Sequence, residues 1–174
     1  MSNAPRRSRS FERIEVIDLR RLAGLANADL DGLFLRAASG VYSGRCILMC
    51  LCQGGAQHFV HGDRGVQDFD VWAFFREHPS MPFPYRWRGK VDFGPSRFGR
   101  NPDDGPEFTG RRVDVIGRSI SVNENETPVA SVQRYLRDSK TESAMLLAER
   151  PVVAIWPDAY LGDVIWQPAQ SIKS

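Results

Sequence analysis

Two aspartates, Asp68 and Asp70, stand one residue apart at the front of an otherwise apolar run that ends at Phe75. Such a run is typical of a buried strand, whose side chains alternate between two faces, so both carboxylates are expected on one face. Two carboxylates this close repel each other, and burying both raises one pKa or requires a cation. Mg²⁺ resolves the conflict, because it binds one or two carboxylates together with phosphates and water. The spacing predicts a metal site. The alternative is that one aspartate lies in a turn and the other at a strand edge, both in contact with solvent.

A third acid, Asp114, lies inside the apolar stretch at residues 113–116. If its strand neighbours the strand of Asp68 and Asp70, the three carboxylates come together and can hold two metal ions for phosphoryl chemistry. The alternative is an exposed strand residue paired with Arg112 or Arg118. The sequence alone leaves both open.

A Gly54-Gly55 pair follows an apolar run and precedes a short stretch that is expected to be helical. Backbone N–H groups at the start of a helix favour phosphate, and glycine permits a close approach. A tight turn that needs a positive φ explains the two glycines equally well.

Together, these motifs resemble those of a known family. Gly-Gly after one strand, a short helix, Asp-x-Asp in the next strand and a lone Asp in a later strand form the pattern of the nucleotidyltransferase superfamily, which has the polymerase-beta-like fold. The stretch GGAQHFVHGDRGVQDFDVW is similar to the version in small bacterial nucleotidyltransferases of the toxin–antitoxin type. The resemblance covers about residues 46–118. Position 55 is glycine, where many active members have serine.

The resemblance implies roles for individual residues. Asp68, Asp70 and Asp114 would be the catalytic residues and the metal ligands, and Asp114 would also help to deprotonate the acceptor. Four further residues would bind the nucleotide: Gly54, Gly55, Arg64 and Arg112.

The same resemblance implies a reaction. A nucleoside monophosphate would pass from a nucleoside triphosphate to a hydroxyl group on a protein, an RNA or a small molecule, with Mg²⁺ or Mn²⁺ as the cofactor. The alternative is a non-catalytic protein of the same fold that binds a nucleotide or a partner. A third possibility, outside the family, is a plain α/β protein whose acids are structural.

Basic residues are dense between positions 86 and 118, and Tyr85 and Trp87 alternate with Arg86 and Arg88. Arginines can hold a triphosphate or an RNA backbone, and the aromatic rings can stack on a base. A solvated loop is the simpler explanation for most of these residues taken singly.

The elements that must position these residues are read from the apolar spacing. Helical spacing runs from residue 11 to 36, where Asn27 or Asp29 could cap a second helix. Strands are expected at residues 46–52, 66–75 and 111–120, with a short helix at 54–62 between the first two. Thr127 and Pro128 predict the start of a helix that ends near residue 139, and a further helix is expected at 140–150. The apolar tail after it could add a short strand or pack irregularly. These elements predict an α/β (α+β) fold with a small mixed sheet and flanking helices.

The domain prediction follows from composition. Residues 1–10 are expected to be a disordered basic tail, and residues 11–174 a single domain. A Pro/Arg-rich insert covers about residues 76–110, with one extended piece at 85–93, and the C-terminal part is helical from about residue 127.

Composition narrows the function classes. The chain has 174 residues, 42% of them hydrophobic, and a net charge of +2, which is too small to favour duplex nucleic acid. No segment approaches the length of a membrane span, and no secretory signal is expected. The chain has three cysteines, Cys46, Cys50 and Cys52, which are predicted to be buried, reduced thiols rather than metal ligands. A cytoplasmic protein without a membrane partner is expected.

Overall fold

The computed structural model describes residues 8–36, 38–83 and 88–169 of the chain. Within these residues the fold is mixed α/β, with one six-stranded sheet in the order β3-β4-β2-β1-β5-β6. The strands are β1 (Cys46–Cys52), β2 (Phe69–Arg76), β3 (Arg88–Asp92), β4 (Arg112–Ile120), β5 (Val152–Trp156) and β6 (Val164–Trp166). Only β2 and β4 are parallel among these neighbours, and the other pairs are antiparallel. The predicted small mixed sheet with flanking helices is therefore confirmed.

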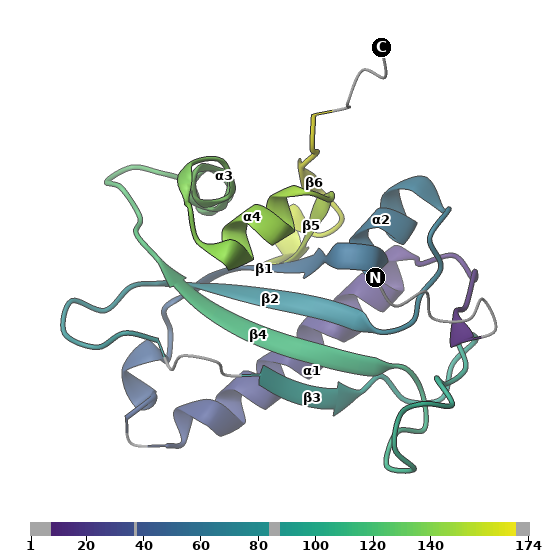
Figure 1. Cartoon of the computed structure of the whole chain (residues 1–174). Helices are drawn as coiled ribbons and strands as arrows, with labels where there is room; N and C mark the ends of the chain where they lie inside the picture. Colours follow the sequence, from purple (N-terminus) through teal and green to yellow (C-terminus); the bar gives the residue numbers. More distant parts are fainter. Residues whose placement is uncertain (1–7, 37, 84–87, 170–174) are drawn as a thin grey trace.

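Helices cover both faces of the sheet (Figure 1). The helices are α1 (Val16–Phe34), α2 (Gln53–His61), α3 (Pro128–Asp138) and α4 (Glu142–Ala148), and the short 3-10 turns are η2 (Gly40–Tyr42) and η3 (Asp158–Tyr160). The long helix α1 crosses one face, whereas α3 and α4 lie on the opposite face. No helix among the described residues is long and apolar enough to cross a membrane.

The strand alternation separates two hydrophobic clusters. Phe69, Val71 and other residues of the same parity pack with the apolar side of α1. Trp72 and Phe74 belong to the second cluster, with residues of α3 and α4. Because Asp70 has the parity of Trp72, it lies on the α3/α4 face of the sheet.

The N-terminal helical region is one helix, so the prediction of a second helix capped by Asn27 or Asp29 is wrong. Both residues lie inside α1, which has its own start signal at Glu15 and Asp18. The Glu15 N–H donates to Asp18 Oδ2 at 2.7 Å, which forms one half of a capping box. The apolar face of α1 is continuous across the polar residues, and packing on the sheet keeps them helical.

The predicted disordered tail ends earlier than expected. Residues 1–7 lie outside the described part of the chain, but residues 8–10 are held in place, so the prediction is wrong for them. Ser10 and Val66 exchange backbone hydrogen bonds of 2.9 and 2.7 Å. Ser8 is buried, and its carbonyl accepts from the Arg111 guanidinium. The buried Arg111 requires carbonyl acceptors, and the N-terminal segment supplies one of them.

The insert at about residues 76–110 is partly regular. Its predicted extended piece contains β3, which pairs with β4, whereas Tyr85, Arg86 and Trp87 lie outside the described residues. Farther along, the rings of Phe93 and Phe98 pack on Phe69 with centroid distances of 5.1 and 5.5 Å. The second half of the insert is thus anchored to the core beside the start of β2.

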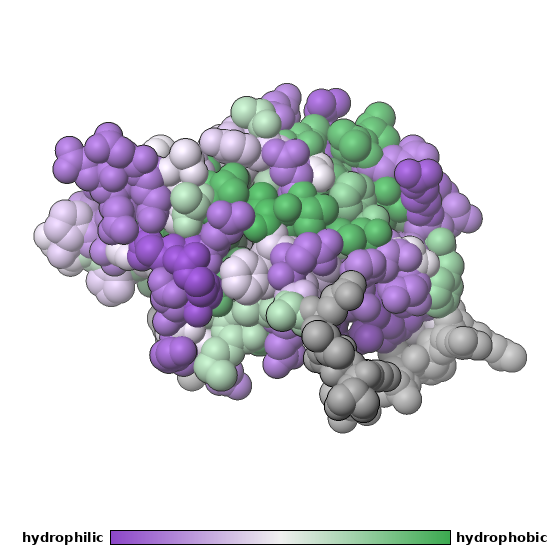
Figure 2. All heavy atoms as spheres, turned by 90° about the horizontal axis from the view of Figure 1, so that it is seen from above, coloured by the Kyte–Doolittle hydropathy of each residue, from purple (hydrophilic) through white to green (hydrophobic). Residues whose placement is uncertain are grey.

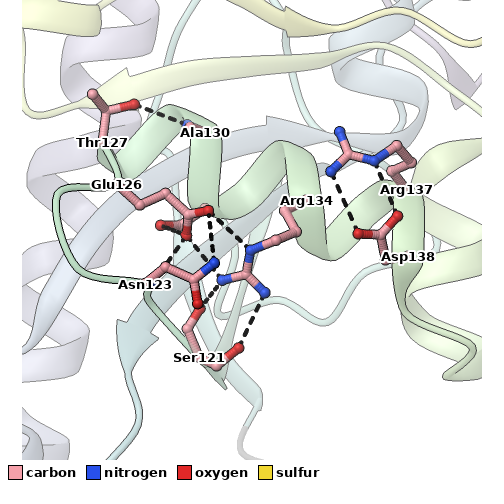
Figure 3. A network of polar contacts seen from close by, with 9 residues as sticks. Ser121, Asn123, Glu126, Thr127, Ala130, Arg134, Arg137 and Asp138 are labelled. Atoms are coloured by element: carbon pink, nitrogen blue, oxygen red, sulfur yellow. Dashed lines mark hydrogen bonds and ion pairs between the residues drawn. The ribbon is translucent and has the colours of Figure 1, made fainter.

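The predicted start of α3 is confirmed, because the Thr127 hydroxyl accepts a hydrogen bond from the Ala130 N–H at 3.1 Å. Figure 3 shows Glu126 and Arg134 turned toward each other just outside this helix start, in contacts of 2.9 Å. Hydrogen bonds from Arg134 and Ser131 lower the pKa of Glu126 to about 2. Arg134 also donates to the Ser121 carbonyl, which ties α3 to the segment after β4.

The α3/α4 side carries an apolar surface. Figure 2 looks down on this side and shows hydrophobic residues in the middle of the face, with hydrophilic residues around them. Exposed Met145 and Leu146 belong to α4, and exposed Val164 belongs to the short edge strand β6.

Candidate functional site

The starts of β2 and β4 bring two of the predicted acids together. Asp70 and Asp114 are register partners on these adjacent parallel strands, so they lie on the same face. Asp114 is completely buried, and Asp70 is partly exposed. The sequence-based condition that the two strands be neighbours is therefore met.

Asp68 lies outside the strand. The predicted strand began at residue 66, but β2 begins at Phe69, so that boundary is wrong. Val66 instead bridges to Ser10, which takes this segment toward the N-terminal residues. The Asp68 side chain, 27% exposed, is oriented by an ion pair with Arg112 at 2.8 Å.

Arg112 is the centre of an acidic cluster on β4. Its Nη2 donates to Asp68 Oδ2 at 2.8 Å and to Asp114 Oδ2 at 3.3 Å. Its Nε lies 3.2 Å from Asp114 Oδ1, and its Nη1 donates to Asp104 Oδ1 at 2.9 Å. One guanidinium thus contacts three carboxylates, two of which are nearly or fully buried (Asp104, 5%; Asp114, 0%).

The electrostatics of this cluster favour a cation. Burial works to lower the pKa of Arg112, but attraction from Asp114, Asp68 and Asp104 outweighs it, so the pKa is raised. The Arg111 guanidinium is also attracted by Asp104 and Asp68, and Arg150 by Asp70, the register partner of Asp114. The acids at this end of the sheet are thus balanced by arginines.

A pocket of about 240 Å³ opens next to the acids, at the start of α2. Its lining is polar and combines both signs of charge. The lining residues are Arg9, Gln53, Gly54, Arg64, Gly65, Gln67, Asp68, Asp70 and Arg150.

Three arginines from distant parts of the chain meet in this pocket. The Arg9 Nη1 donates to the Arg64 carbonyl at 3.1 Å, which holds the N-terminal segment against the loop between α2 and β2. Burial lowers the pKa of Arg150, and repulsion from Arg64 and Arg9 lowers it further against the attraction of Glu149 and Asp70. Arginines that repel one another at a half-buried polar pocket create a binding site for an anion.

The start of α2 contributes Gln53 and Gly54 to the pocket wall. Gln53, its first residue, has a φ of 56°, a left-handed conformation that is costly for a residue with a side chain. Gly54 lines the pocket, and a Cβ there would lie 3.8 Å from both the Arg64 and the Arg150 side chains. Backbone strain of this kind concentrates at functional sites.

Gly55 has a different environment from Gly54. It is buried, and a Cβ at this position would lie only 3.1 Å from Leu51 and 3.6 Å from Phe69. The close packing of α2 on the sheet accounts for glycine here. Gly55 does not belong to the pocket lining.

The structure divides the predicted site residues into two adjoining groups. Gly54, Arg64, Asp68 and Asp70 line the pocket. Arg112 and Asp114 lie behind it in the acidic cluster, and Asp68 belongs to both groups.

Three charged site residues were missed by sequence reasoning: Arg9, Asp104 and Arg150. Arg9 falls in the stretch that was expected to be disordered, and Arg150 follows a helix whose end carries no recognisable motif. Asp104 lies in the insert, where the sequence analysis assigned no role to an acid. Arg150 stands two residues before β5, and the pairing of β5 with β1, which no local pattern indicates, brings it to the pocket.

Mg²⁺ and Mn²⁺ require oxygen ligands that converge on one point. Among the described residues, no group of three or more His, Cys, Asp and Glu side chains is arranged to hold a metal ion. The carboxylates at the starts of β2 and β4 nevertheless supply the oxygen ligands that these ions take. The Arg112 guanidinium contacts oxygens of Asp68 and Asp114 at 2.8–3.3 Å. These carboxylates therefore have the donor chemistry that a divalent cation takes, while the guanidinium contacts their oxygens in this structure.

Comparisons with known proteins provide no relative. No protein-family model matches the chain, and no match was found among the curated proteins or the solved structures.

Proposed function

We propose that the chain is a metal-dependent nucleotidyltransferase, which transfers a nucleoside monophosphate from a nucleoside triphosphate to a hydroxyl group. The observation that carries this proposal is the composition of the pocket at the start of α2. Asp68 and Asp70 line it together with Arg9, Arg64 and Arg150. A metal–polyphosphate complex carries the complementary arrangement of charges, because its cation needs carboxylates and its phosphates need arginines.

In this proposal the arginines of the pocket and the N–H groups near Gly54 bind the phosphates, and Asp68, Asp70 and Asp114 would hold Mg²⁺ or Mn²⁺. A bound metal ion would neutralise the negative charge on the phosphates and on the leaving group. The arginines are contributed by three separate segments, so they fix the direction of the phosphate chain as well as its charge.

The reaction forms one bond and breaks one. The acceptor hydroxyl oxygen attacks the α-phosphorus, the bond from that phosphorus to the bridging oxygen breaks, and pyrophosphate leaves in line with the attack. The acceptor proton passes to Asp114 in this proposal. Because Arg112 contacts both Asp114 oxygens, Asp114 can take this role only after the guanidinium has moved.

The proposal is tested by incubating the protein with α-labelled ATP or GTP and Mg²⁺, and by measuring pyrophosphate release and label transfer to protein and RNA acceptors. Asp68→Asn and Asp70→Asn should abolish transfer while the circular dichroism spectrum stays native. Asp63→Asn is the matched control, because Asp63 is an exposed acid in the same loop and does not line the pocket. Transfer at the wild-type rate by either pocket variant would refute the assignment.

A second candidate is a non-catalytic protein that binds a nucleotide or a partner. The observation that favours it is the ion-pair cluster, in which Arg112 already supplies a positive charge to Asp68 and Asp114. Glycine at position 55, where many active members of the nucleotidyltransferase superfamily have serine, also favours it. Metal-dependent binding of ATP or GTP without pyrophosphate release on any acceptor would support this candidate.

Membership of the nucleotidyltransferase superfamily and a cytoplasmic location are part of the proposal. The Gly-Gly, Asp-x-Asp and later Asp pattern supports the first, together with the pairing of Asp70 with Asp114. The three free cysteines support the second, because reduced thiols persist in the cytosol.

A further inference from the structure

We propose that Arg112 is a built-in counter-ion that excludes the divalent metal from Asp68 and Asp114 until a nucleotide binds. The guanidinium and the metal would then exchange places, so that metal and nucleotide bind cooperatively. This inference rests on the proposed function, because it concerns the same acids and the same substrate.

The first step of the argument is that Arg112 and a metal compete for the same atoms. Arg112 Nη2 lies 2.8 Å from Asp68 Oδ2 and 3.3 Å from Asp114 Oδ2, and Nε lies 3.2 Å from Asp114 Oδ1. A metal that binds these oxygens needs ligand distances of about 2.0–2.1 Å for Mg²⁺. Two cations held by the same oxygens would be only a few ångströms apart and would repel each other. Both cannot occupy the site together.

The second step is that the cluster needs one of the two cations. Asp114 is fully buried and Asp104 nearly so, and buried carboxylates are costly without a positive partner. Arg112 meets this need without metal, since it contacts all three acids of the cluster. A protein built in this way should bind metal weakly when no nucleotide is present.

The third step is that a nucleotide offers Arg112 a new partner. Asp68 contacts Arg112 and also lines the phosphate pocket, so the guanidinium lies directly behind the pocket wall. Its side chain is 26% exposed, so solvent reaches part of it. Phosphate oxygens bind guanidinium groups through paired hydrogen bonds, as carboxylates do. A bound polyphosphate would therefore favour the release of Asp68 and Asp114 to the metal.

The test measures Mn²⁺ binding by electron paramagnetic resonance, with and without ATP, in the wild type and in Arg112→Gln. A control titration of ATP with Mn²⁺ gives the affinity in the absence of protein. We expect ATP to raise the affinity of the wild-type site for Mn²⁺ on the order of tenfold, as is typical of coupled sites. In Arg112→Gln the affinity without ATP should already be high, and the effect of ATP should largely disappear.

Arg118→Gln is the matched control. Arg118 lies on the same strand, and its guanidinium donates to Ser143 at 2.8 Å. Its loss changes the net charge by the same amount, so it measures the general effect of a missing positive charge on Mn²⁺ affinity. Arg112→Lys is the second variant, for use if Arg112→Gln does not fold. An ammonium cannot bridge three carboxylates as the planar guanidinium does, so an intermediate coupling is expected.

The outcomes separate this inference from the proposed function. Equal coupling by ATP in the wild type and in Arg112→Gln, with metal-dependent transfer present, would overturn the inference and leave the function standing. Equal gains in Mn²⁺ affinity in Arg112→Gln and Arg118→Gln would reduce the effect to general charge and would also overturn the inference. Failure of every variant to bind Mn²⁺, with or without ATP, would overturn both.

Discussion

The two partners of the Arg112–Asp114 ion pair should contribute unequally to the free energy of unfolding. Removing one partner of a buried pair costs about 3–5 kcal/mol, because a buried charge loses its compensation. Arg112→Gln withdraws the guanidinium from three acids at once, among them the fully buried Asp114. We expect a loss of about 4 kcal/mol for this variant.

Asp114→Asn should cost far less. The guanidinium keeps Asp68 at 2.8 Å and Asp104 at 2.9 Å, and an asparagine oxygen can still accept a hydrogen bond from it. The substitution also removes a fully buried charge, which is itself costly to desolvate. What remains is the difference between a charged and a neutral hydrogen bond, about 1–2 kcal/mol.

Urea unfolding of the wild type, both single variants and the double variant measures these quantities. The double variant lacks both charges of the pair, so its loss should fall below the summed losses of the single variants by at least about 1 kcal/mol. Unchanged m-values would show that the midpoint shifts report stability rather than a change in the unfolded state. Equal losses for the two single variants, or strict additivity in the double variant, would refute the reasoning.

Three further predictions concern other parts of the fold. Burial works to raise the pKa of Asp92, but hydrogen bonds from a neighbouring hydroxyl and from backbone N–H groups lower it from 3.8 to about 2. The stability that Asp92 contributes is therefore complete above pH 3.8 and lost as the pH falls toward 2. The urea midpoints of the wild type and Asp92→Asn should differ at neutral pH and converge in acid. A difference that stays constant with pH would contradict this prediction. Burial raises the pKa of the Cys50 and Cys52 thiols well above the ordinary value, so both should react with a thiol reagent only after unfolding, and rapid reaction of the native protein would contradict their placement. A Cβ at Gly110 would collide with backbone atoms, so Gly110→Ala should lose at least about 1–3 kcal/mol in thermal unfolding, whereas Gly24→Ala, with nothing within 4 Å, should be neutral or stabilising.

Several elements were predictable because their signals are local. The uninterrupted apolar run of β1 and the Thr127-Pro128 start of α3 each depend on residues within one short segment. The lone acid between apolar neighbours likewise placed Asp114 in a strand, which is β4. For these segments the local preference and the tertiary environment agree.

The errors arose where distant contacts override the local pattern. Asn27 and Asp29 suit a helix cap, but packing of α1 on the sheet keeps them inside one helix. The polar residues 8–10 read as a tail, yet Arg111 and Val66 hold them in the fold. The extended piece predicted at residues 85–93 contains β3, but its partner was not predicted, because β4 lies beyond the rest of the insert.

The sequence by itself determined which charged residues exist and which of them stand inside apolar strands, since both follow from the order of residues along the chain. It thereby determined Asp70 and Asp114 as candidates. Only the tertiary structure decided what surrounds them. Arg112 and Asp68 are 44 residues apart in the chain, and the parallel pairing of β2 with β4 brings them into contact. The Ser10–Val66 bridge brings Arg9 to the pocket, and the pairing of β5 with β1 brings Arg150 there. Such meetings depend on strand pairing across long loops, for which no short stretch of sequence carries a signal.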